Sequence, residues 1–189
     1  MEITEQQLKK ISEFVESKLD SLNWHHTLQV RKLALKIGSY EKADLNLIEA
    51  SALLHDVGKN ETDKDHAQLS AEMARKFLEH EKFNQNFIEE TVYCILCHDY
   101  AWKGELEKLL TLESKVLADA DILNWLSPMG IVKAIYHEEA FVKQDVNEAV
   151  KKILETVDKV SLYVQTKSAK KMIKERSIKV KEFYQGLLK

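Results

Sequence analysis

The stretch Ala52-Leu53-Leu54-His55-Asp56-Val57-Gly58-Lys59 is an apolar helical run that ends in an adjacent imidazole and carboxylate. Buried imidazoles and carboxylates are costly unless they are paired or coordinated, so His55 and Asp56 require a cation or a strong hydrogen-bond partner. Because glycine often takes the left-handed conformation that stops a helix, Gly58 predicts a helix end with His55 and Asp56 in the last turn. The alternative is an ordinary helix C-terminus with a histidine that suits the helix dipole.

The composition favours an all-α protein. The chain has 189 residues, enough for one substantial core with a C-terminal extension but cramped for two full domains. Five glycines and one proline are too few for an all-β protein with many turns, and the chain is rich in Leu, Lys, Glu and Ala. We therefore expect a single domain of helices joined by short loops.

The charge and the hydropathy of the chain give no support for a nucleic-acid partner or a membrane span. With 28 basic and 31 acidic residues the formal charge is −3, so no overall positive field draws in nucleic acid, and a nucleic-acid partner is unsupported. The N-terminal residues 1–5 lack an apolar signal core, and no run approaches the roughly 18 apolar residues of a membrane span. We therefore expect a cytoplasmic protein without a membrane partner. The lysines in 167–189 alternate with apolar and acidic residues, which favours a solvated helix face.

Apolar residues recur at three- and four-residue steps along most of the chain, which predicts amphipathic helices. Thr4 with Gln7 resembles a capping box, Asp44 is a candidate N-cap, and Pro128 marks a restart. The predicted helices cover residues 4–19, 23–40, 44–56, 66–80, 83–98, 112–126 and 131–142, with further helices from residue 146 to the C-terminus.

Four ionisable residues interrupt these apolar stripes, and they come from three separate segments. They are His26, His55, Asp56 and Asp121. Two imidazole nitrogens and two carboxylate oxygens form a ligand set suited to Mn, Fe, Co, Ni, Zn or Mg, with positions left open for water and substrate. Such a cation lowers the pKa of its water toward neutrality and neutralises phosphate oxygens. The neighbouring His25 is rotated away by about 100° on helical geometry, which predicts a surface or supporting position.

Three segments in this order resemble the HD-domain metal-dependent phosphohydrolases, an all-helical superfamily. The similar segments are Trp24 to Arg31, Leu53 to Lys59 and Leu117 to Leu123, so the resemblance extends over residues 24–126. It implies a single helical HD-domain bundle over residues 1–189. In that bundle, residues 22–127 form the core with the metal site and residues 128–189 form C-terminal helices packed on it.

The resemblance also implies roles for single residues. It makes His26, His55, Asp56 and Asp121 the metal ligands and Lys59 a candidate phosphate contact. Asp119 and Asp121 both follow an alanine, and two residues apart on a helix they cannot face the same point. We assign the ligand role to Asp121, which is followed by Ile-Leu as in the family motif, and a supporting position to Asp119.

His66 and His98 occupy positions similar to those of histidines that hold a second metal in some members of the superfamily. Six donors would then serve two cations about 3.5–4 Å apart. Because His66 begins a predicted helix, whose N-terminal dipole disfavours a cation, we expect one metal instead. His98 and His66 are then catalytic groups, with Lys59, that face the substrate phosphate.

The expected function is hydrolysis of a nucleotide or other small phosphate ester by attack of a metal-bound hydroxide, with a phosphomonoesterase favoured. One alternative is a phosphodiesterase on a cyclic or dinucleotide with a binuclear site. Another is a non-catalytic, metal-stabilised helical interaction module. The oligomeric state stays open.

The segment from Cys94 to His98 has the form of a haem attachment motif, but two cysteines within one predicted helix favour reduced core thiols.

Overall fold

The computed structural model describes residues 3–62, 64–137, 143 and 145–188, and within these ranges every regular element is a helix. The all-α class that the sequence predicts is therefore confirmed. The helices in chain order are α1 (Glu5–Glu16), α2 (Ser21–Glu41), α3 (Leu45–Leu54), α4 (His66–His80), α5 (Gln85–Lys103), the short 3-10 helix η1 (Leu106–Lys108), α6 (Leu112–Trp125), α7 (Pro128–His137), α9 (Val146–Ser161) and α10 (Lys167–Gly186).

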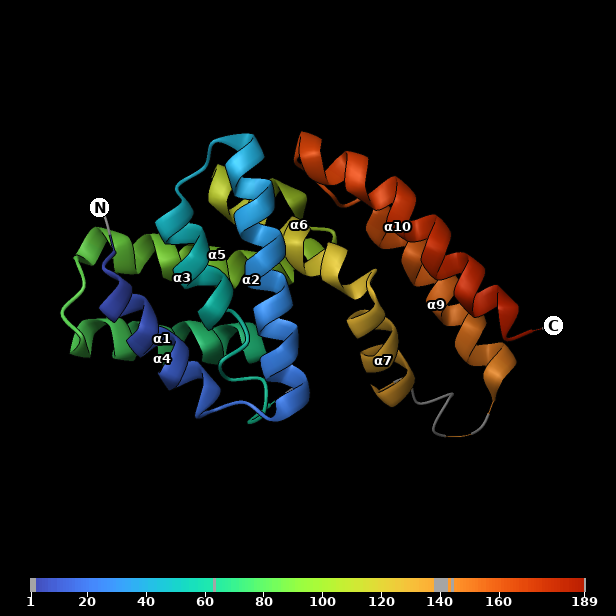
Figure 1. Cartoon of the computed structure of the whole chain (residues 1–189), viewed down its shortest axis with the longest axis horizontal. Coiled ribbons are helices and arrows are strands. Elements are labelled where there is room, and N and C mark those ends of the chain that lie inside the picture. The colour runs from blue at the N-terminus through green and yellow to red at the C-terminus, as the bar shows by residue number, and fades with distance from the viewer. Residues whose placement is uncertain (1–2, 63, 138–142, 144, 189) are drawn as a thin grey trace.

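The helices form two groups along the long axis of the molecule (Figure 1). Helices α1 to α6 form a bundle at one end, α9 and α10 run side by side at the other end, and α7 lies between them. Within the bundle, α3 packs against α2, α5 and α6. The end of α3 therefore points the His55-Asp56 pair into the space that these helices enclose.

Two clusters of buried apolar side chains form the core. One joins α1, α3, α4 and α5, and the other joins α2, α3, α5 and α6 to α9 and α10. Val150 and Val157 of α9 and Tyr184 of α10 are buried in the second cluster together with residues of α2 and α6. This shared core supports our proposal that residues 1–189 form one domain in which residues 128–189 pack on the 22–127 core.

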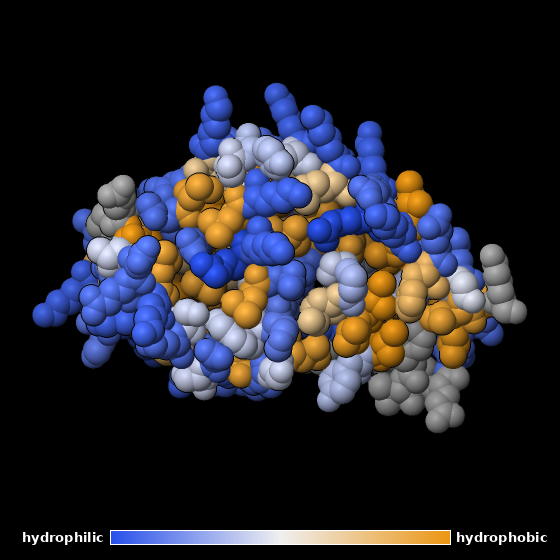
Figure 2. All heavy atoms as spheres, viewed as in Figure 1, coloured by the Kyte–Doolittle hydropathy of each residue, from blue (hydrophilic) through white to orange (hydrophobic). Residues whose placement is uncertain are grey.

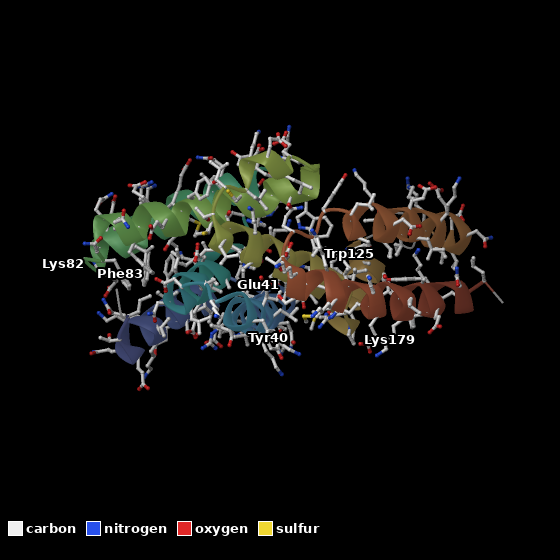
Figure 3. The ribbon with its side chains drawn as sticks, turned by 90° about the horizontal axis from the view of Figure 1, so that it is seen from above. Tyr40, Glu41, Lys82, Phe83, Trp125 and Lys179 are labelled. Atoms are coloured by element: carbon white, nitrogen blue, oxygen red, sulfur yellow. The ribbon has the colours of Figure 1, made fainter. Side chains whose placement is uncertain are left out.

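Helix α10 is also fixed to the bundle by polar contacts at its N-terminal end. The backbone N–H and the hydroxyl of Ser168 both donate to Oε1 of Glu41, each at 2.7 Å. Seen from above, Glu41 lies where α2 meets the start of α10 (Figure 3). These contacts join the last residue of α2 to the first turn of α10.

Capping groups set several helix starts as the sequence predicts. Thr4 and Gln7 form the capping box of α1, and the Asp44 side chain accepts the backbone N–H groups of Asn46 and Leu47 at the start of α3. Helix α5 extends beyond the predicted end at His98 and stops at Gly104, which is left-handed with a φ of 79°. His98 therefore lies inside a helix, not at its end.

The predicted left-handed helix end at Gly58 is wrong. Helix α3 ends at Leu54, His55 is a right-handed C-cap, and the chain continues through successive turns. Gly58 is required instead by a close approach to α4, since a Cβ there would lie 2.9 Å from Cγ of Leu69. The backbone N–H of Gly58 donates to Oγ of Ser70 at 3.0 Å, which fixes the turn after the His-Asp pair.

Beyond the bundle, the helix predicted for residues 131–142 begins earlier, at Pro128, and its last five predicted residues lie outside the described ranges. The segment from Val146 onward forms two helices, with Thr166 as the N-cap of the second. No helix in the described part of the chain combines the length and apolar character that a membrane crossing requires.

Candidate metal centre

Helix α2 carries His26 into the centre of the bundle, where the side chain is 7% exposed. Its Nε2 atom lies 3.2 Å from Nε2 of His55, 3.4 Å from Oδ2 of Asp56 and 3.3 Å from Oδ1 of Asp121. The structure therefore brings together the four side chains that the sequence suggests as ligands. His25, in contrast, is exposed, with Nδ1 2.7 Å from the carbonyl of Ser21.

The imidazole of His55 is fully buried and fixed in one orientation. Its Nδ1 donates to the carbonyl of Ala52 at 2.8 Å, so in the neutral ring Nε2 carries a lone pair that faces the cluster. Burial lowers the pKa of His55 to about 4, which keeps the ring neutral near pH 7. A neutral imidazole with its far nitrogen held by a carbonyl is the form that binds a metal.

Asp56 lies at the centre of the cluster, and its two oxygens face different histidines. Oδ2 lies 3.4 Å from His26 and 3.6 Å from His55, whereas Oδ1 lies 3.4 Å from Nε2 of His66 and 3.6 Å from Nε2 of His98. Burial opposes ionisation of this carboxyl, but the surrounding histidines hold the pKa of Asp56 well below its usual value. Its Oδ1 is buried without a hydrogen-bond partner among the described residues, an arrangement that a cation would satisfy.

Asp121 reaches the cluster with one oxygen only. Its Oδ2 accepts the indole N–H of Trp102 at 2.6 Å, which leaves Oδ1 facing His26. Burial opposes the charge of Asp121, but His26, His55 and His98 lower its pKa. The carboxylate is thus oriented by Trp102 to present a single donor atom.

Asp119 points away from the cluster, and the supporting position expected for it is not what the structure shows. Its carboxylate accepts the backbone N–H groups of Gln165 and Thr166 at 2.8 and 2.7 Å, and the Thr166 hydroxyl at 2.6 Å. Burial raises the pKa of Asp119 to about 6, against the effect of these hydrogen bonds. Asp119 therefore joins α6 to the start of α10. Its partners lie more than forty residues along the chain.

His66 and His98 meet on the other side of Asp56, with their Nε2 atoms 3.3 Å apart. Nδ1 of His98 faces the carbonyl of Ile95, three residues earlier, as Nδ1 of His55 faces that of Ala52. Burial opposes protonation of His98, but the adjacent negative charge of the Asp56 carboxylate raises its pKa. His66 begins α4 as predicted, yet its ring still reaches His98 and Asp56.

These residues fit a divalent cation. Two groups of three side chains each bring one ligand atom from every member to within 4.8 Å of the others: His26, His55 and Asp56, and Asp56, His66 and His98. Imidazole nitrogens and carboxylate oxygens are donors for first-row metals and Zn²⁺. Asp56 belongs to both groups.

A pocket of about 250 Å³ opens over the cluster. Lys59 lines it, with Nζ 3.5 Å from Nδ1 of His66. His98 is 1% exposed and lies behind Asp56, outside the lining of the pocket. Four further residues line the pocket that the sequence did not predict as site residues: Asp99, Trp102, Trp125 and Lys133. Trp102 follows His98 by four residues, and Trp125 follows Asp121 by four, so helical spacing could have placed both tryptophans at the site. Nothing in the sequence marked Lys133.

Known proteins are similar to this chain in sequence and in fold. The sequence model of the HD domain family matches residues 23–126. The protein YpgQ of Bacillus subtilis is 32% identical over 113 residues, which cover 59% of this chain and 55% of YpgQ, about half its length. A crystal structure of YpgQ in complex with ADP superposes with a TM-score of 0.71 at 25% identity, over 96% of this chain and 93% of that one.

A second similar protein is a predicted HD superfamily hydrolase from an uncultured Thermotogales bacterium, with a TM-score of 0.67 at 26% identity, over 96% of this chain and 91% of that structure. The family match covers more than half of the chain and includes the three segments that supply His26, the His55-Asp56 pair and Asp121. The chain therefore belongs to the HD domain superfamily of hydrolases and is similar to YpgQ.

Proposed function

We propose that this chain is a metal-dependent phosphohydrolase that acts on a nucleotide or another small phosphate ester, with a phosphomonoesterase favoured. The observation that carries the proposal is the position of Asp56, shared by two donor groups below an open pocket whose wall includes Lys59 and Lys133. Buried carboxylates with histidines provide for a cation, and lysines beside them provide for phosphate oxygens.

The resident cation is held by His26, His55, Asp56 and Asp121 in this proposal. When bound, it would neutralise phosphate oxygens and lower the pKa of a coordinated water. Trp102 holds Asp121 in place through its indole N–H, and the carbonyl of Ala52 holds the lone pair of His55 toward the cluster. These neighbours fix the ligands before any substrate arrives, which reduces the reorganisation needed for reaction.

The substrate side of the pocket has two kinds of group. Lys59 and His66 lie together on one wall and serve as donors to phosphate oxygens, with His98 supporting them from behind Asp56. Trp102 and Trp125 also line the pocket, with ring centroids 6.0 Å apart and planes at 78°. Aromatic faces suit a nucleobase. The structure of the relative YpgQ in complex with ADP supports a nucleotide-like substrate for this chain.

A second candidate is a phosphodiesterase with a binuclear centre. The group formed by Asp56, His66 and His98 favours it, because a carboxylate that faces two histidine pairs with separate oxygens can join two cations. A metal-stabilised interaction module without catalysis is the remaining alternative. It predicts that chelation unfolds the protein and that no divalent metal supports hydrolysis of a phosphate ester.

The test is a screen of phosphorylated metabolites with chelator-treated protein reloaded separately with Mn, Fe, Co, Ni, Zn or Mg. We expect phosphate release from a nucleotide or small monoester with at least one of these metals. Turnover only of cyclic or dinucleotides would favour the phosphodiesterase. No turnover with any metal, together with loss of helix content on chelation, would favour the interaction module.

A further inference from the structure

A second and larger cavity, of about 800 Å³, lies between α2, the junction of α6 with α7, and α10. It shares no lining residue with the pocket over the metal cluster. In Figure 2, hydrophobic side chains gather over α7, beside hydrophilic side chains over α2 and the first half of α10. Pockets of 300–1,000 Å³ are the usual size for small-molecule sites. The volume therefore suits a ligand of nucleotide or lipid-fragment size.

The charged residues that line this cavity are mostly basic. Lys32 and Lys36 come from α2, Arg176 and Lys179 come from α10, and Glu175 is the one carboxylate in the lining. Lys179 pairs with Glu175 at 2.5 Å, whereas Lys32 and Lys36 form no ion pair with any residue that the structure describes. The opening therefore carries a net positive charge, and the ammonium groups of Lys32 and Lys36 form no ion pair with a described carboxylate.

Arg176 adds a half-buried charge to this wall. Its Nη1 donates to the carbonyl of Leu123 at 2.6 Å, near the end of α6, and burial lowers the pKa of its guanidinium. Within the described ranges, no carboxylate forms an ion pair with Arg176. A half-buried guanidinium that is bonded only to a neutral carbonyl is stabilised by an anion placed beside it.

The deeper part of the cavity is apolar. Leu33, Leu126 and Val180 are buried there, and Met129 and Met172 are half-buried beside them. Methionine side chains adapt to the shape of a bound group, because they are unbranched and polarisable. The cavity thus combines a basic opening with an adaptable apolar interior.

We propose that this cavity is a second ligand site, separate from the metal cluster, for a small molecule that carries a phosphate group on an apolar or aromatic body. The phosphate lies among Lys32, Lys36 and Arg176, and the body lies against Leu126 and the two methionines. Asn124 also lines the cavity, and its amide contacts His26. A single residue, Asn124, therefore separates a ligand in this cavity from His26 of the metal cluster.

The test uses 1-anilinonaphthalene-8-sulfonate, which has an aromatic body and one anionic group, in fluorescence titrations of the full chain. We expect saturable binding of this probe. N-phenyl-1-naphthylamine has the same rings without the sulfonate and should bind at least about tenfold more weakly, because it makes no charge-assisted contacts. The double variant Lys32→Gln with Lys36→Gln should weaken sulfonate binding by a similar factor. The double variant Lys9→Gln with Lys18→Gln, on the surface of the N-terminal segment, should not.

Two further arms complete the experiment. Asp56→Ala should leave probe binding unchanged, so a failure of the proposed hydrolase function would not affect this result. ADP or dodecyl phosphate, the latter below its critical micelle concentration, should displace the probe, and the one that displaces it tells whether the ligand is a nucleotide or an alkyl phosphate. Inorganic phosphate at the same concentration should not displace it. Equal binding of the neutral probe, no effect of the Lys32 and Lys36 changes, or displacement by neither organic phosphate would overturn the proposal.

Discussion

The side-chain amide nitrogen of Asn124 lies 2.7 Å from Nδ1 of His26, on the side of the imidazole opposite the carboxylates. Both side chains are buried. With the amide N–H donating to Nδ1, the proton of a neutral His26 ring lies on Nε2, the atom that faces Asp56 and Asp121. A cation bound at Nε2 would leave the ring proton on Nδ1, which would then require an acceptor. Asn124 can serve both forms, because its amide offers either nitrogen or oxygen.

The first prediction follows from this contact. Asn124→Leu should lower the affinity for Mn²⁺ by roughly 10–100-fold, because the partner that orients a metal-binding histidine is lost. Asn124→Asp should retain most of the affinity, since a carboxylate accepts the Nδ1 proton. Isothermal titration of chelator-treated protein measures both. If the leucine variant bound Mn²⁺ as the wild type does, the amide would have no role in orienting His26.

The second prediction separates the two carboxylates of α6. Asp119→Ala should lower the free energy of unfolding by about 1–3 kcal/mol, because two backbone N–H groups before α10 lose their acceptor. Its metal content should stay normal. Asp121→Ala should show the opposite pattern, with lost metal and a smaller change in denaturant midpoint. Reversed outcomes would give Asp119 the ligand role.

The sequence suggested the four residues of the proposed ligand set because each of them interrupts an apolar stripe, and a buried charge on such a stripe needs a partner. His26 and Asp121 lie 95 positions apart, and only the order of motifs suggested that they meet. The structure places their nearest atoms 3.3 Å apart. Helix class and capping at Thr4 and Asp44 also followed from local patterns, since caps involve neighbours three residues away.

Other features depended on contacts that a local pattern does not contain. Gly58 looked like a helix terminator, but its lack of a side chain is required by α4, which packs against it from twelve residues further along. The partners of Asp119 come from the segment before α10. Lys133 lines the pocket because α7 packs against both α2 and α6, and no periodicity in its own helix marks that position.

The third prediction concerns Lys59. Lys59→Ala should raise KM for a phosphorylated substrate with normal metal content, because the ammonium group lines the pocket without belonging to either donor group. Lys64→Ala removes the same charge from an exposed position on the same loop and is the matched control. Identical kinetics for both variants and the wild type would assign Lys59 to the solvated loop.

The fourth prediction concerns the number of cations. With one resident cation, elemental analysis should give one equivalent per chain in both the wild type and His98→Ala, and the variant should be catalytically impaired. Two equivalents in the wild type that fall to one in His98→Ala would instead establish the binuclear centre formed with Asp56 and His66. His80→Ala, on the exposed end of α4, controls for loss of an imidazole.

The most direct test of the account is metal-dependent phosphate release by Asp56→Ala, measured beside the wild type and a surface control, Asp158→Ala, with the best substrate and metal from the screen. Asp56 supplies a carboxylate to both donor groups, whereas the apolar core is built from other residues. We predict that Asp56→Ala keeps the helix content of the wild type and releases no phosphate above the protein-free background, while Asp158→Ala matches the wild type. Phosphate release by Asp56→Ala at the wild-type rate would contradict the assignment of this cluster as the hydrolytic centre.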